Sequence, residues 1–481
     1  MRVQIDGTDR RGRFDAPCAK PDPFENLPES ELLNPAGYRP EFLRSILRFD
    51  AVRGLFSPES TAEGNLEIVR QAAVHSVELA LSLGITVSLF TAPVRRFAPE
   101  LWRSHLEDGF LSSGLLGGMM ITEPGCGTDL MACQTRCRRS GAGYELDGTK
   151  HWAGLTGLAD YWLILARDEI EDRSRGFPSL NFFICRNDPE AFKVLKLYGT
   201  AGLRSIPYGV TDIHAGLDVL APLLSGNRVR RFRQIHSILH RSRISISAIT
   251  LGACQRIAAD TLTHVQSRRV FGRVLAEYGQ AQARLSEIEA CRDISQVLFR
   301  VACREAVRED TVKNAEVDSL SANVVKIVCT DLAFAAATSA SQLLGGNSYR
   351  TDTYIGRATA DLRPFRIFEG SNDVLCEAVW AAVEKAVKTG GPSFQVLVKG
   401  VAARAGLPEP RTSILFEGCG DPNQPQGVRC LGGRILANAL SLQWCLDQGC
   451  DAAACRPLIS RMCRDLAAAE SDGPRAGLGE Y

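Results

Sequence analysis

The stretch that decides the fold is residues 121–154, "ITEPGCGTDLMACQTRCRRSGAGYELDGTKHWAG". Its first nine residues combine glycine, proline and threonine, which predicts a turn whose backbone N–H groups and hydroxyls face a polar ligand. An ordinary connecting loop is the alternative that so short a motif leaves open. The pair Asp147-Gly148 predicts a β-hairpin turn. Trp152 then offers a broad apolar face, which either stacks on a ring or is buried in the core.

The sequence changes in character on both sides of this stretch. Residues 66–115 read as apolar-rich helices, whereas short apolar runs such as "YWLILA" and "LNFFIC" indicate strands between residues 117 and 223. After residue 228 helical patterns return, and one of them ends at Gly345-Gly346. Helices, then a compact β segment, then a bundle of long helices indicate separate domains.

Composition excludes several classes of protein. The chain has 481 residues, of which 45% are hydrophobic and 23% charged, as in ordinary globular proteins. A formal net charge of +1 gives no reason to expect a nucleic acid partner. Because no run of about 18 apolar residues occurs, no membrane span is predicted. The first residues lack the apolar core of a signal peptide, so we expect a cytoplasmic protein.

The cysteines predict neither a disulfide scaffold nor a metal site. The chain has 16 cysteines, most of them scattered through apolar or helical patterns, where reduced cysteine acts as a small hydrophobe. The densest group runs from Cys445 to Cys463 and has no CxxC pair and no accompanying histidine. We therefore predict no metal.

The stretch "FRIFEGSND", residues 365–373, places one carboxylate among apolar neighbours. No basic residue accompanies Glu369 between Ile367 and Asp373. An acid in such surroundings is either a solvated loop residue or a group that transfers a proton. Partial burial raises the pKa of a carboxyl group and so makes it a better general base near neutral pH.

Four segments, met in this order, resemble the acyl-CoA dehydrogenase family. Residues 121–154 with the following strand run resemble its flavin-binding β domain. "SRRVFGRVL" at 267–275 is similar to its Arg-x-x-Phe-Gly segment, and "QLLGGNSYR" at 342–350 to its Gln-x-x-Gly-Gly segment. "DLRPFRIFEGSNDVL" at 361–375 resembles the stretch that carries its catalytic glutamate. The resemblance covers residues 70–385, and the last hundred residues or so lie outside it.

The resemblance implies an α+β multidomain fold of the acyl-CoA dehydrogenase type. "GGRILANALSLQWCLDQGC", near the C-terminus, is too rich in Leu, Ala and Trp for disorder and predicts an additional helical piece. We predict an N-terminal arm at 1–45, an N-terminal helical domain at 46–116, a middle β-barrel-like domain at 117–225, a C-terminal four-helix bundle at 226–387 and a helical C-terminal extension at 388–481.

FAD is the cofactor that the resemblance implies. Ile121 and Thr122 would contact the pyrimidine edge of the isoalloxazine, and residues 152–154 would border its outer face and N5. Arg268 and Phe271 would reach the FAD of a neighbouring subunit, which implies a homo-oligomer, either a dimer or a tetramer. The complete predicted cofactor set is Met119, Ile121, Thr122, Gly127, Thr128, Trp152, Ala153, Gly154, Arg268, Phe271, Gln342, Gly345, Gly346, Ser371 and Asp373.

Glu369 is the catalytic base that the resemblance implies. It would remove the α-proton of an acyl thioester while hydride leaves the β-carbon for flavin N5, as in fatty acid metabolism. Some relatives carry their base on a helix beside the arginine of the segment that reads "RSRIS" here, but that position is Ser242, which cannot act as a base. The predicted substrate-binding residues are Thr128, His240, Arg243 and Gly370.

Departures from the family pattern leave the substrate carrier and the reaction open. Gly154 stands where threonine is common, and His240 where short- and medium-chain relatives have aspartate. "RVRRFR" at 228–233 is either a solvated helix start or an anion site for CoA phosphate or an acidic carrier protein. We expect an acyl-CoA dehydrogenase that uses an acceptor such as electron transfer flavoprotein. The alternatives are an acyl-carrier-protein-linked dehydrogenase, a flavin monooxygenase or oxidase, and a flavin-bearing binding protein without catalysis.

Overall fold

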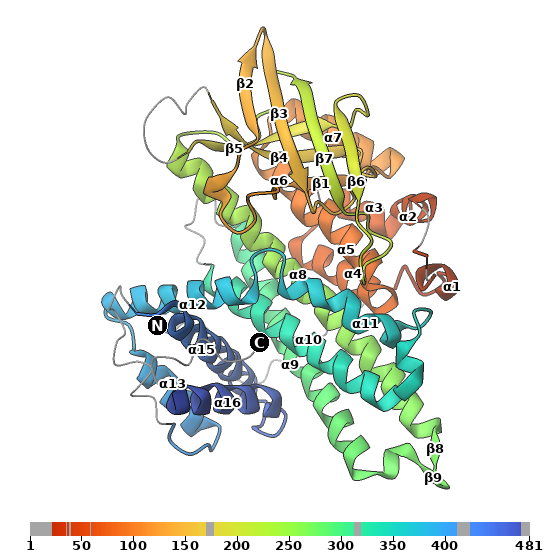
Figure 1. The fold of residues 1–481 in the computed structure, drawn as a ribbon, viewed down its shortest axis with the longest axis vertical. Coiled ribbons are helices and arrows are strands. Elements are labelled where there is room, and N and C mark those ends of the chain that lie inside the picture. Colours follow the sequence, from red (N-terminus) through yellow and green to blue (C-terminus); the bar gives the residue numbers. More distant parts are fainter. Residues whose placement is uncertain are drawn as a thin grey trace. The chain divides into compact units, whose positions relative to one another are not determined.

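The structure is a computed structural model that describes residues 22–34, 36–37, 40–57, 59–169, 178–311, 319–410 and 424–472. Most of the predicted N-terminal arm, together with residues 411–423 and 473–481, lies outside these residues. The chain divides into two compact units, Leu27–Ser371 and Asn372–Tyr481 with Met1–Asn26. Figure 1 shows the elements of both units, each of which is described separately. The predicted fold class is confirmed by the known proteins that share it, which are named below.

Helices open the larger unit. Residues 29–32 and 40–47, all but the last two of which were predicted as part of an arm, are helical and bury Leu32, Leu43 and Leu47. A long, largely buried helical segment follows, in which α5 continues into the π-helical η2 and then into α6. These elements are α1 Glu29–Leu32, α2 Pro40–Leu47, α3 Asp50–Arg53, η1 Gly54–Phe56, α4 Ala62–His75, α5 Val77–Gly84, η2 Ile85–Thr91, α6 Ala92–Phe97 and α7 Glu100–Ser113.

A seven-stranded sheet follows, in the order β1-β4-β2-β3-β7-β6 with β5 paired to β4. The strands β4 and β5 are almost wholly buried, whereas β6 is exposed along most of its length. Their bounds are β1 Gly117–Met120, β2 Arg136–Ser140, β3 Gly143–His151, β4 Tyr161–Asp168, β5 Leu180–Arg186, β6 Phe192–Leu197 and β7 Gly209–Leu217, with the short η3 at Leu130–Ala132.

The hairpin turn predicted at Asp147-Gly148 is wrong. Both residues lie inside β3, paired with His214 and Ile213 of β7. The turn falls instead between Ser140 and Gly143, where β2 meets β3. Gly148 is required for another reason, because a Cβ there would lie 2.8 Å from the backbone Cα of Thr135.

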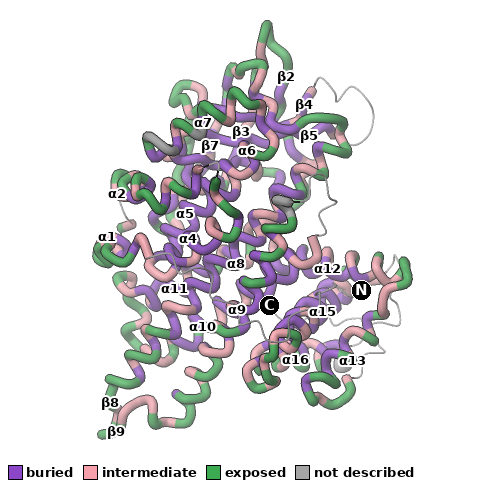
Figure 2. The backbone as a smooth tube through the Cα atoms, turned by 180° about the vertical axis from the view of Figure 1, so that it is seen from behind, coloured by how far each residue is buried: buried purple, intermediate pink, exposed green. Residues whose placement is uncertain are grey.

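Three long helices form the core of the bundle, since α8, α9 and α10 pack on one another and α4 packs on α8. The middle turns of α8 and α10 are buried, as Figure 2 shows. As predicted, α10 ends before Gly345, which has a φ of +58°. The elements are α8 Arg228–Ser267, β8 Arg269–Val270, β9 Arg273–Val274, η4 Leu275–Glu277, α9 Gly279–Thr311, α10 Leu320–Leu344, η5 Gly345–Tyr349, α11 Tyr354–Leu362 and η6 Arg363–Arg366.

The smaller unit is helical in its described residues. It begins at Asn372, whereas the extension was predicted to begin at residue 388. The cause is close packing of α12 against α15, where a Cβ on Gly433 would lie 1.8 Å from the carbonyl oxygen of Cys376. Its helices are α12 Asn372–Lys388, α13 Phe394–Arg404, α15 Gln426–Asp447 and α16 Arg456–Asp472.

Two helical stretches pass a test of length and composition for membrane crossing, Val77–Phe97 and Leu320–Tyr349. Of their most apolar windows, 89% and 72% respectively are buried inside the structure, and core helices of folded proteins pass the same test. The described cysteines are free thiols, nearly all of them buried. Among the described residues, no three His, Cys, Asp or Glu side chains gather as metal ligands.

Candidate active site

A buried ion pair shapes the loop that follows β1. Lys150, near the end of β3, donates to Glu123 Oε1 at 2.7 Å, and both side chains are almost fully buried. The same carboxylate accepts from the backbone of Gln134 at 2.6 Å and from the hydroxyl of Thr135 at 2.6 Å. Burial alone raises the pKa of Glu123, but Lys150 and these hydrogen bonds outweigh it and lower the pKa to about 2. Both ends of the loop, residues 121–135, are therefore tied to the sheet.

Backbone hydrogen bonds bring the predicted flavin-edge residues together. The N–H of His151 donates to the carbonyl of Thr122 at 2.9 Å, and the N–H of Trp152 donates to the carbonyl of Gly209 at 3.0 Å. Trp152 has a φ of +58°, its side chain is 52% exposed, and its ring lies 4.4 Å from that of Tyr198. The predicted alternative of a buried core tryptophan is therefore wrong, and an exposed aromatic face stands beside Thr122.

Gly154 lies against the π-helical stretch η2. A Cβ added at Gly154 would lie 2.7 Å from Cδ1 of Ile85 and 3.5 Å from Cε1 of Tyr208. Ile85 therefore takes space that a side chain at position 154 would need. π-helical turns are rare and often occur at functional sites. Ser88 of the same stretch hydrogen-bonds Ser245 of α8 at 3.0 Å, so η2 connects the sheet side of the site to α8.

A cluster of buried charged residues binds the segment at residues 203–205, just before Tyr208, which lies beside Gly154. The backbone N–H of Leu203 donates to Asp361 at 2.7 Å, and that of Ser205 donates to Glu78 at 3.1 Å. Arg357 pairs with both carboxylates. Burial and the charge of Glu78 raise the pKa of Asp361, although Arg357 opposes that rise. The cluster was not predicted, because its members lie far apart in the sequence.

Glu369 lies on a strained turn. Its φ is +60°, in the left-handed region that a residue with a Cβ seldom adopts, and Gly370 follows with a φ of +88°. The carboxyl atom Oε2 is shielded from solvent and has no hydrogen-bond partner among the described residues. Strain and an unsatisfied buried polar atom at one residue indicate a functional constraint.

Two helices supply cations to this turn. Arg243 of α8 donates from Nε to the backbone carbonyl of Glu369 at 2.9 Å and from Nη1 to Asn323 at 3.0 Å. Lys326 of α10 donates to the carbonyl of Gly370 at 2.8 Å and is 0% exposed. Sequence reasoning missed Lys326 and Asn323, although a lone lysine in the apolar run "ANVVKIVC" was the available signal.

The environment of Glu369 is suited to a general base. Burial raises the pKa of its carboxyl group above the ordinary value. The charge of Arg243, a hydrogen bond from Ser242 and the charge of Lys326 oppose part of that rise. The solvated-acid alternative is therefore wrong. Ser242, excluded as a base from the sequence, acts here as a donor to the carboxyl group.

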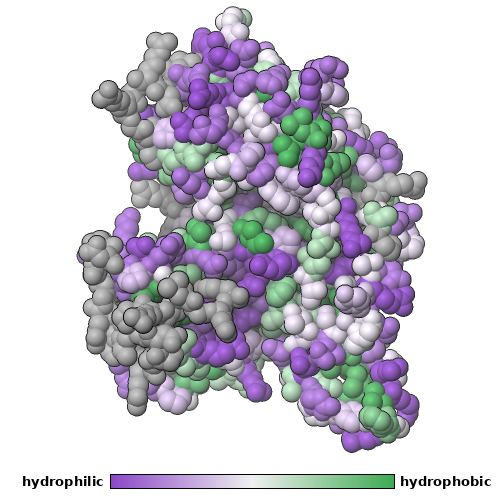
Figure 3. All heavy atoms as spheres, in the orientation of Figure 1, coloured by the Kyte–Doolittle hydropathy of each residue, from purple (hydrophilic) through white to green (hydrophobic). Residues whose placement is uncertain are grey.

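A second group of predicted residues lies at the opposite end of α8. Phe271, at the tip of the β8–β9 hairpin, is 96% exposed, and Arg268 precedes it. The ring of His264 hydrogen-bonds the backbone of Leu343, which places the end of α10 beside this hairpin. Figure 3 shows apolar side chains gathered at this end of the bundle. The predicted residues at this end of the bundle are Arg268, Phe271, Gln342, Gly345 and Gly346.

Two predicted substrate-side features are buried. His240, predicted to bind substrate, is 1% exposed on α8, and its role stays a prediction. Arg231 is buried and pairs with Asp168 of β4 at 3.1 Å, so it belongs to neither a solvated face nor an anion site. Arg230, by contrast, is exposed. The roles of the remaining predicted residues stay predictions. Of these, Met119 and Ala153 are buried, Ser371 is half-buried, and Gly127, Thr128 and Asp373 are exposed. Asp373 lies in the first turn of α12 in the smaller unit.

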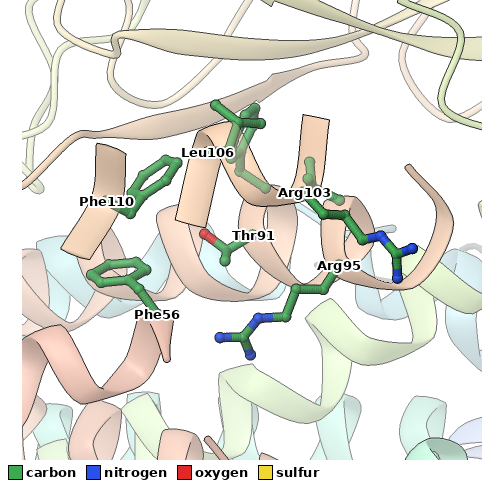
Figure 4. Close-up of a pocket in the computed structure, with 8 residues that line it drawn as sticks. Phe56, Thr91, Arg95, Arg103, Leu106 and Phe110 are labelled. Atoms are coloured by element: carbon green, nitrogen blue, oxygen red, sulfur yellow. The ribbon is translucent and has the colours of Figure 1, made fainter. Parts of the chain in front are cut away.

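A small enclosed cavity in the N-terminal helices is a separate feature. Its volume of about 10 Å³ accommodates roughly one water molecule. Figure 4 shows the rings of Phe56 and Phe110 on one side of it and the side chains of Arg95 and Arg103 on the other. None of the predicted site residues lines it.

Comparison with known proteins identifies the family. The family model "Acyl-CoA dehydrogenase, middle domain" matches residues 118–215, and "Acyl-CoA dehydrogenase, C-terminal domain" matches residues 232–384. The short-chain specific acyl-CoA dehydrogenase of Megasphaera elsdenii is 25% identical over 311 residues, which cover 64% of this chain and 78% of that protein. The very long-chain specific enzyme of Mus musculus is 24% identical over 65% of this chain, and the match spans only 48% of that enzyme.

A solved structure extends the likeness of fold to nearly the whole chain. The acyl-CoA dehydrogenase of Bacillus anthracis, complexed with FAD, covers 92% of this chain and 85% of its own, with a TM-score of 0.77 at 17% identity. These findings define a flavin-dependent oxidoreductase that acts on CH–CH groups. The chain belongs to the acyl-CoA dehydrogenase family, and FAD is its cofactor.

The residues present fit a large planar cofactor. Cβ atoms built at Gly127, Gly345 and Gly346 meet nothing within 4 Å, so each glycine leaves open space beside the backbone. Trp152 and Phe271 present aromatic faces to the surface rather than to the core. Exposed glycine backbone and exposed rings are what phosphate and ring binding require.

Proposed function

We propose that this protein oxidises an acyl-CoA thioester to the 2-enoyl-CoA, with Glu369 removing the α-proton. The observation that carries this proposal is the shielded, unpartnered Oε2 of Glu369 on its strained turn. FAD, when bound, accepts the hydride that leaves the β-carbon. The raised pKa of Glu369 keeps its carboxylate basic enough to take a weakly acidic proton.

The carbonyl of the thioester needs a hydrogen-bond donor as the α-proton leaves. The backbone N–H of Glu369 is our candidate, because it belongs to the same turn as the base. The left-handed φ of Glu369 sets the direction of that N–H relative to the carboxyl group. One short turn would therefore supply both the base and the donor.

Titration with substrates tests this proposal. We expect acyl-CoA thioesters to bleach the flavin absorbance of the FAD-loaded protein anaerobically, because hydride transfer reduces the flavin. The relatives' names range from short-chain to very long-chain and cyclohexane-1-carbonyl substrates, so the panel must span chain length and branching. A panel in which no thioester bleaches the flavin would rule the proposal out. Matched acyl-carrier-protein thioesters form the second arm.

The structure gives less support than the sequence did to the alternative of an acyl-carrier-protein substrate. It depended on the arginines at residues 228–233, of which Arg231 is committed to a buried ion pair with Asp168. CoA thioesters are therefore the substrates that we propose. Faster bleaching by the acyl-carrier-protein arm would reverse this choice.

A flavin oxidase or monooxygenase remains a second candidate because of Gly154, which lacks a side chain that could meet N5. Ile85 fills part of that space, however, so the position is apolar rather than open. Oxygen consumption by the reduced protein distinguishes the two activities. A dehydrogenase should instead deliver its electrons to an acceptor such as electron transfer flavoprotein, which we propose as the partner.

We also propose that two chains share each FAD, in a cytoplasmic homo-oligomer. Along α8, Arg268 lies 25 residues beyond Arg243, about 37 Å at the helical rise of 1.5 Å per residue. The hairpin residues are therefore well separated from the base of their own chain. This separation supports a role for the hairpin at a neighbouring chain's cofactor.

Replacing Arg268 with alanine tests the shared site. We expect Arg268→Ala to lower FAD content and to weaken the oligomer together, because a ligand bound by two chains links cofactor retention to assembly. Sedimentation and the flavin-to-protein absorbance ratio, measured over a concentration series, report both effects. Arg273→Ala, an exposed arginine of the same hairpin, is the matched control. Full FAD content in a stable monomer would contradict the shared site.

A further inference from the structure

We propose that Lys326 is a positioning residue for the base: with Arg243, it holds the two consecutive backbone carbonyls of the Glu369–Gly370 turn and leaves the carboxylate aimed and available. The inference rests on the proposed function in treating Glu369 as the base. Nothing in the family assignment or the comparisons assigns Lys326 a role.

The contacts of the two cations carry the argument. Arg243 Nε binds the carbonyl of Glu369 at 2.9 Å, and Lys326 Nζ binds the carbonyl of Gly370 at 2.8 Å. The two donors come from different helices, α8 and α10, so both helices bind the turn. A glutamate keeps a left-handed backbone conformation only where surrounding groups stabilise it. Charge-assisted hydrogen bonds to both of its successive carbonyls are such a constraint.

These contacts show that the two cations bind the backbone of the turn rather than the carboxylate of Glu369. A cation placed on the carboxylate itself would favour its charged form strongly and make it a poor base. Here the cations donate to backbone carbonyls, while Oε2 has no hydrogen-bond partner in the described part of the chain. The charge of Arg243, a hydrogen bond from Ser242 and the charge of Lys326 each lower the pKa of the carboxyl group. Beyond Arg243 lies His236, whose pKa is lowered by burial and by that arginine.

The replacement Lys326→Met tests the proposal. We expect the acid limb of the pH profile for flavin reduction to move up by about one pH unit, because a positive charge near the carboxyl group is lost. The maximum rate should fall about 10- to 100-fold as the turn loosens, since small misplacements of a base are costly. The KM for acyl-CoA should stay unchanged, because Lys326 binds backbone rather than substrate.

A second variant separates the effect of the hydrogen bond to the carbonyl of Gly370 from the effect of the positive charge. Lys326→Gln keeps a donor for the carbonyl of Gly370 but carries no charge. We expect the shifted acid limb to persist in Lys326→Gln while part of the lost rate returns. If Lys326→Met does not accumulate as folded protein, Lys326→Gln carries the test. Lys193→Met, at an exposed lysine of β6, is the matched control and should behave as the unaltered protein.

An infrared titration decides the matter without substrate. The carboxyl band of Glu369, assigned by its loss in Glu369→Gln, should titrate at a higher pH in both Lys326 variants of the FAD-loaded protein. An unchanged titration midpoint in both variants would overturn the proposal even if acyl-CoA bleaches the flavin. If no thioester bleaches the flavin, the proposed function fails, and the infrared titration still tests whether Lys326 acts on the carboxyl group of Glu369.

Discussion

The replacement Glu369→Gln is expected to slow flavin reduction by acyl-CoA about 10²- to 10⁴-fold, the usual contribution of a general base. Glutamine keeps the shape of the side chain but cannot take a proton. It also removes a buried charge, so folding and FAD content should be preserved or slightly improved. Stopped-flow bleaching of the flavin under anaerobic conditions measures the effect. Bleaching at the full rate would show that another group is the base.

The pH dependence of the unaltered protein gives a second reading of the same residue. Because burial raises the pKa of Glu369, the carboxyl group is protonated and inactive below that pKa and becomes competent as pH rises through it. The rate of reduction should therefore rise with pH along a limb that lies above the ordinary titration range of glutamate. Glu145→Gln, an exposed glutamate of β3, is the matched control and should leave the limb in place.

The family and the fold class could be predicted from the sequence because they depend on local signals. The turn segment after β1, the Gly345 stop of α10 and the segment around Glu369 each lie in one short run of residues. The comparisons confirm the family and FAD. Local signals fail where a residue's role depends on a distant partner. Gly148 illustrates this, since it reads as a turn glycine but is required by the approach of Thr135.

The charged residues show the same limit more clearly. Arg231 belongs to a run of arginines that reads as a solvated or anion-binding helix start, yet one turn of α8 points it at buried Asp168. Lys326 lies in an apolar helix whose pattern predicts core packing, yet it reaches the turn that carries Glu369. In both cases the partner lies far along the chain, so only the folded chain reveals the pairing. The sequence predicts Glu369 as the base, but it does not predict the groups that hold the turn of Glu369.

The largest structural effect is expected at Lys150. Replacing it with methionine leaves Glu123 buried without its cation, which typically costs about 3–5 kcal/mol in the free energy of unfolding. The loop at residues 121–135 is anchored through this carboxylate, so FAD retention should fall as well. Urea denaturation followed by tryptophan fluorescence measures the first effect, and the flavin-to-protein absorbance ratio measures the second. Lys193→Met, at an exposed lysine of β6, is the control.

The pH dependence of this loss identifies its cause. In the unaltered protein the folded pKa of Glu123 is about 2, below the ordinary value of 4.5. Its contribution to stability is therefore present above pH 4.5 and is lost as pH falls toward 2. In Lys150→Met the lysine no longer opposes the effect of burial, so the folded pKa of Glu123 rises above about 2 and the carboxylate contributes less stability at neutral pH. The difference between the two proteins should thus grow with pH.

The double replacement Glu123→Gln with Lys150→Met separates an unpaired charge from a packing defect. If the cost of Lys150→Met is the uncompensated carboxylate, removing that carboxylate should restore much of the stability, because a buried ion pair often contributes little more than neutral groups of similar shape. The amide oxygen of the glutamine introduced by Glu123→Gln can still accept from the backbone N–H of Gln134 or Thr135, so the loop keeps part of its anchor. A double variant as unstable as Lys150→Met, with a loss that does not vary with pH, would mean that the lysine stabilises the loop by packing alone. The ion pair would then be incidental to the shape of the flavin site.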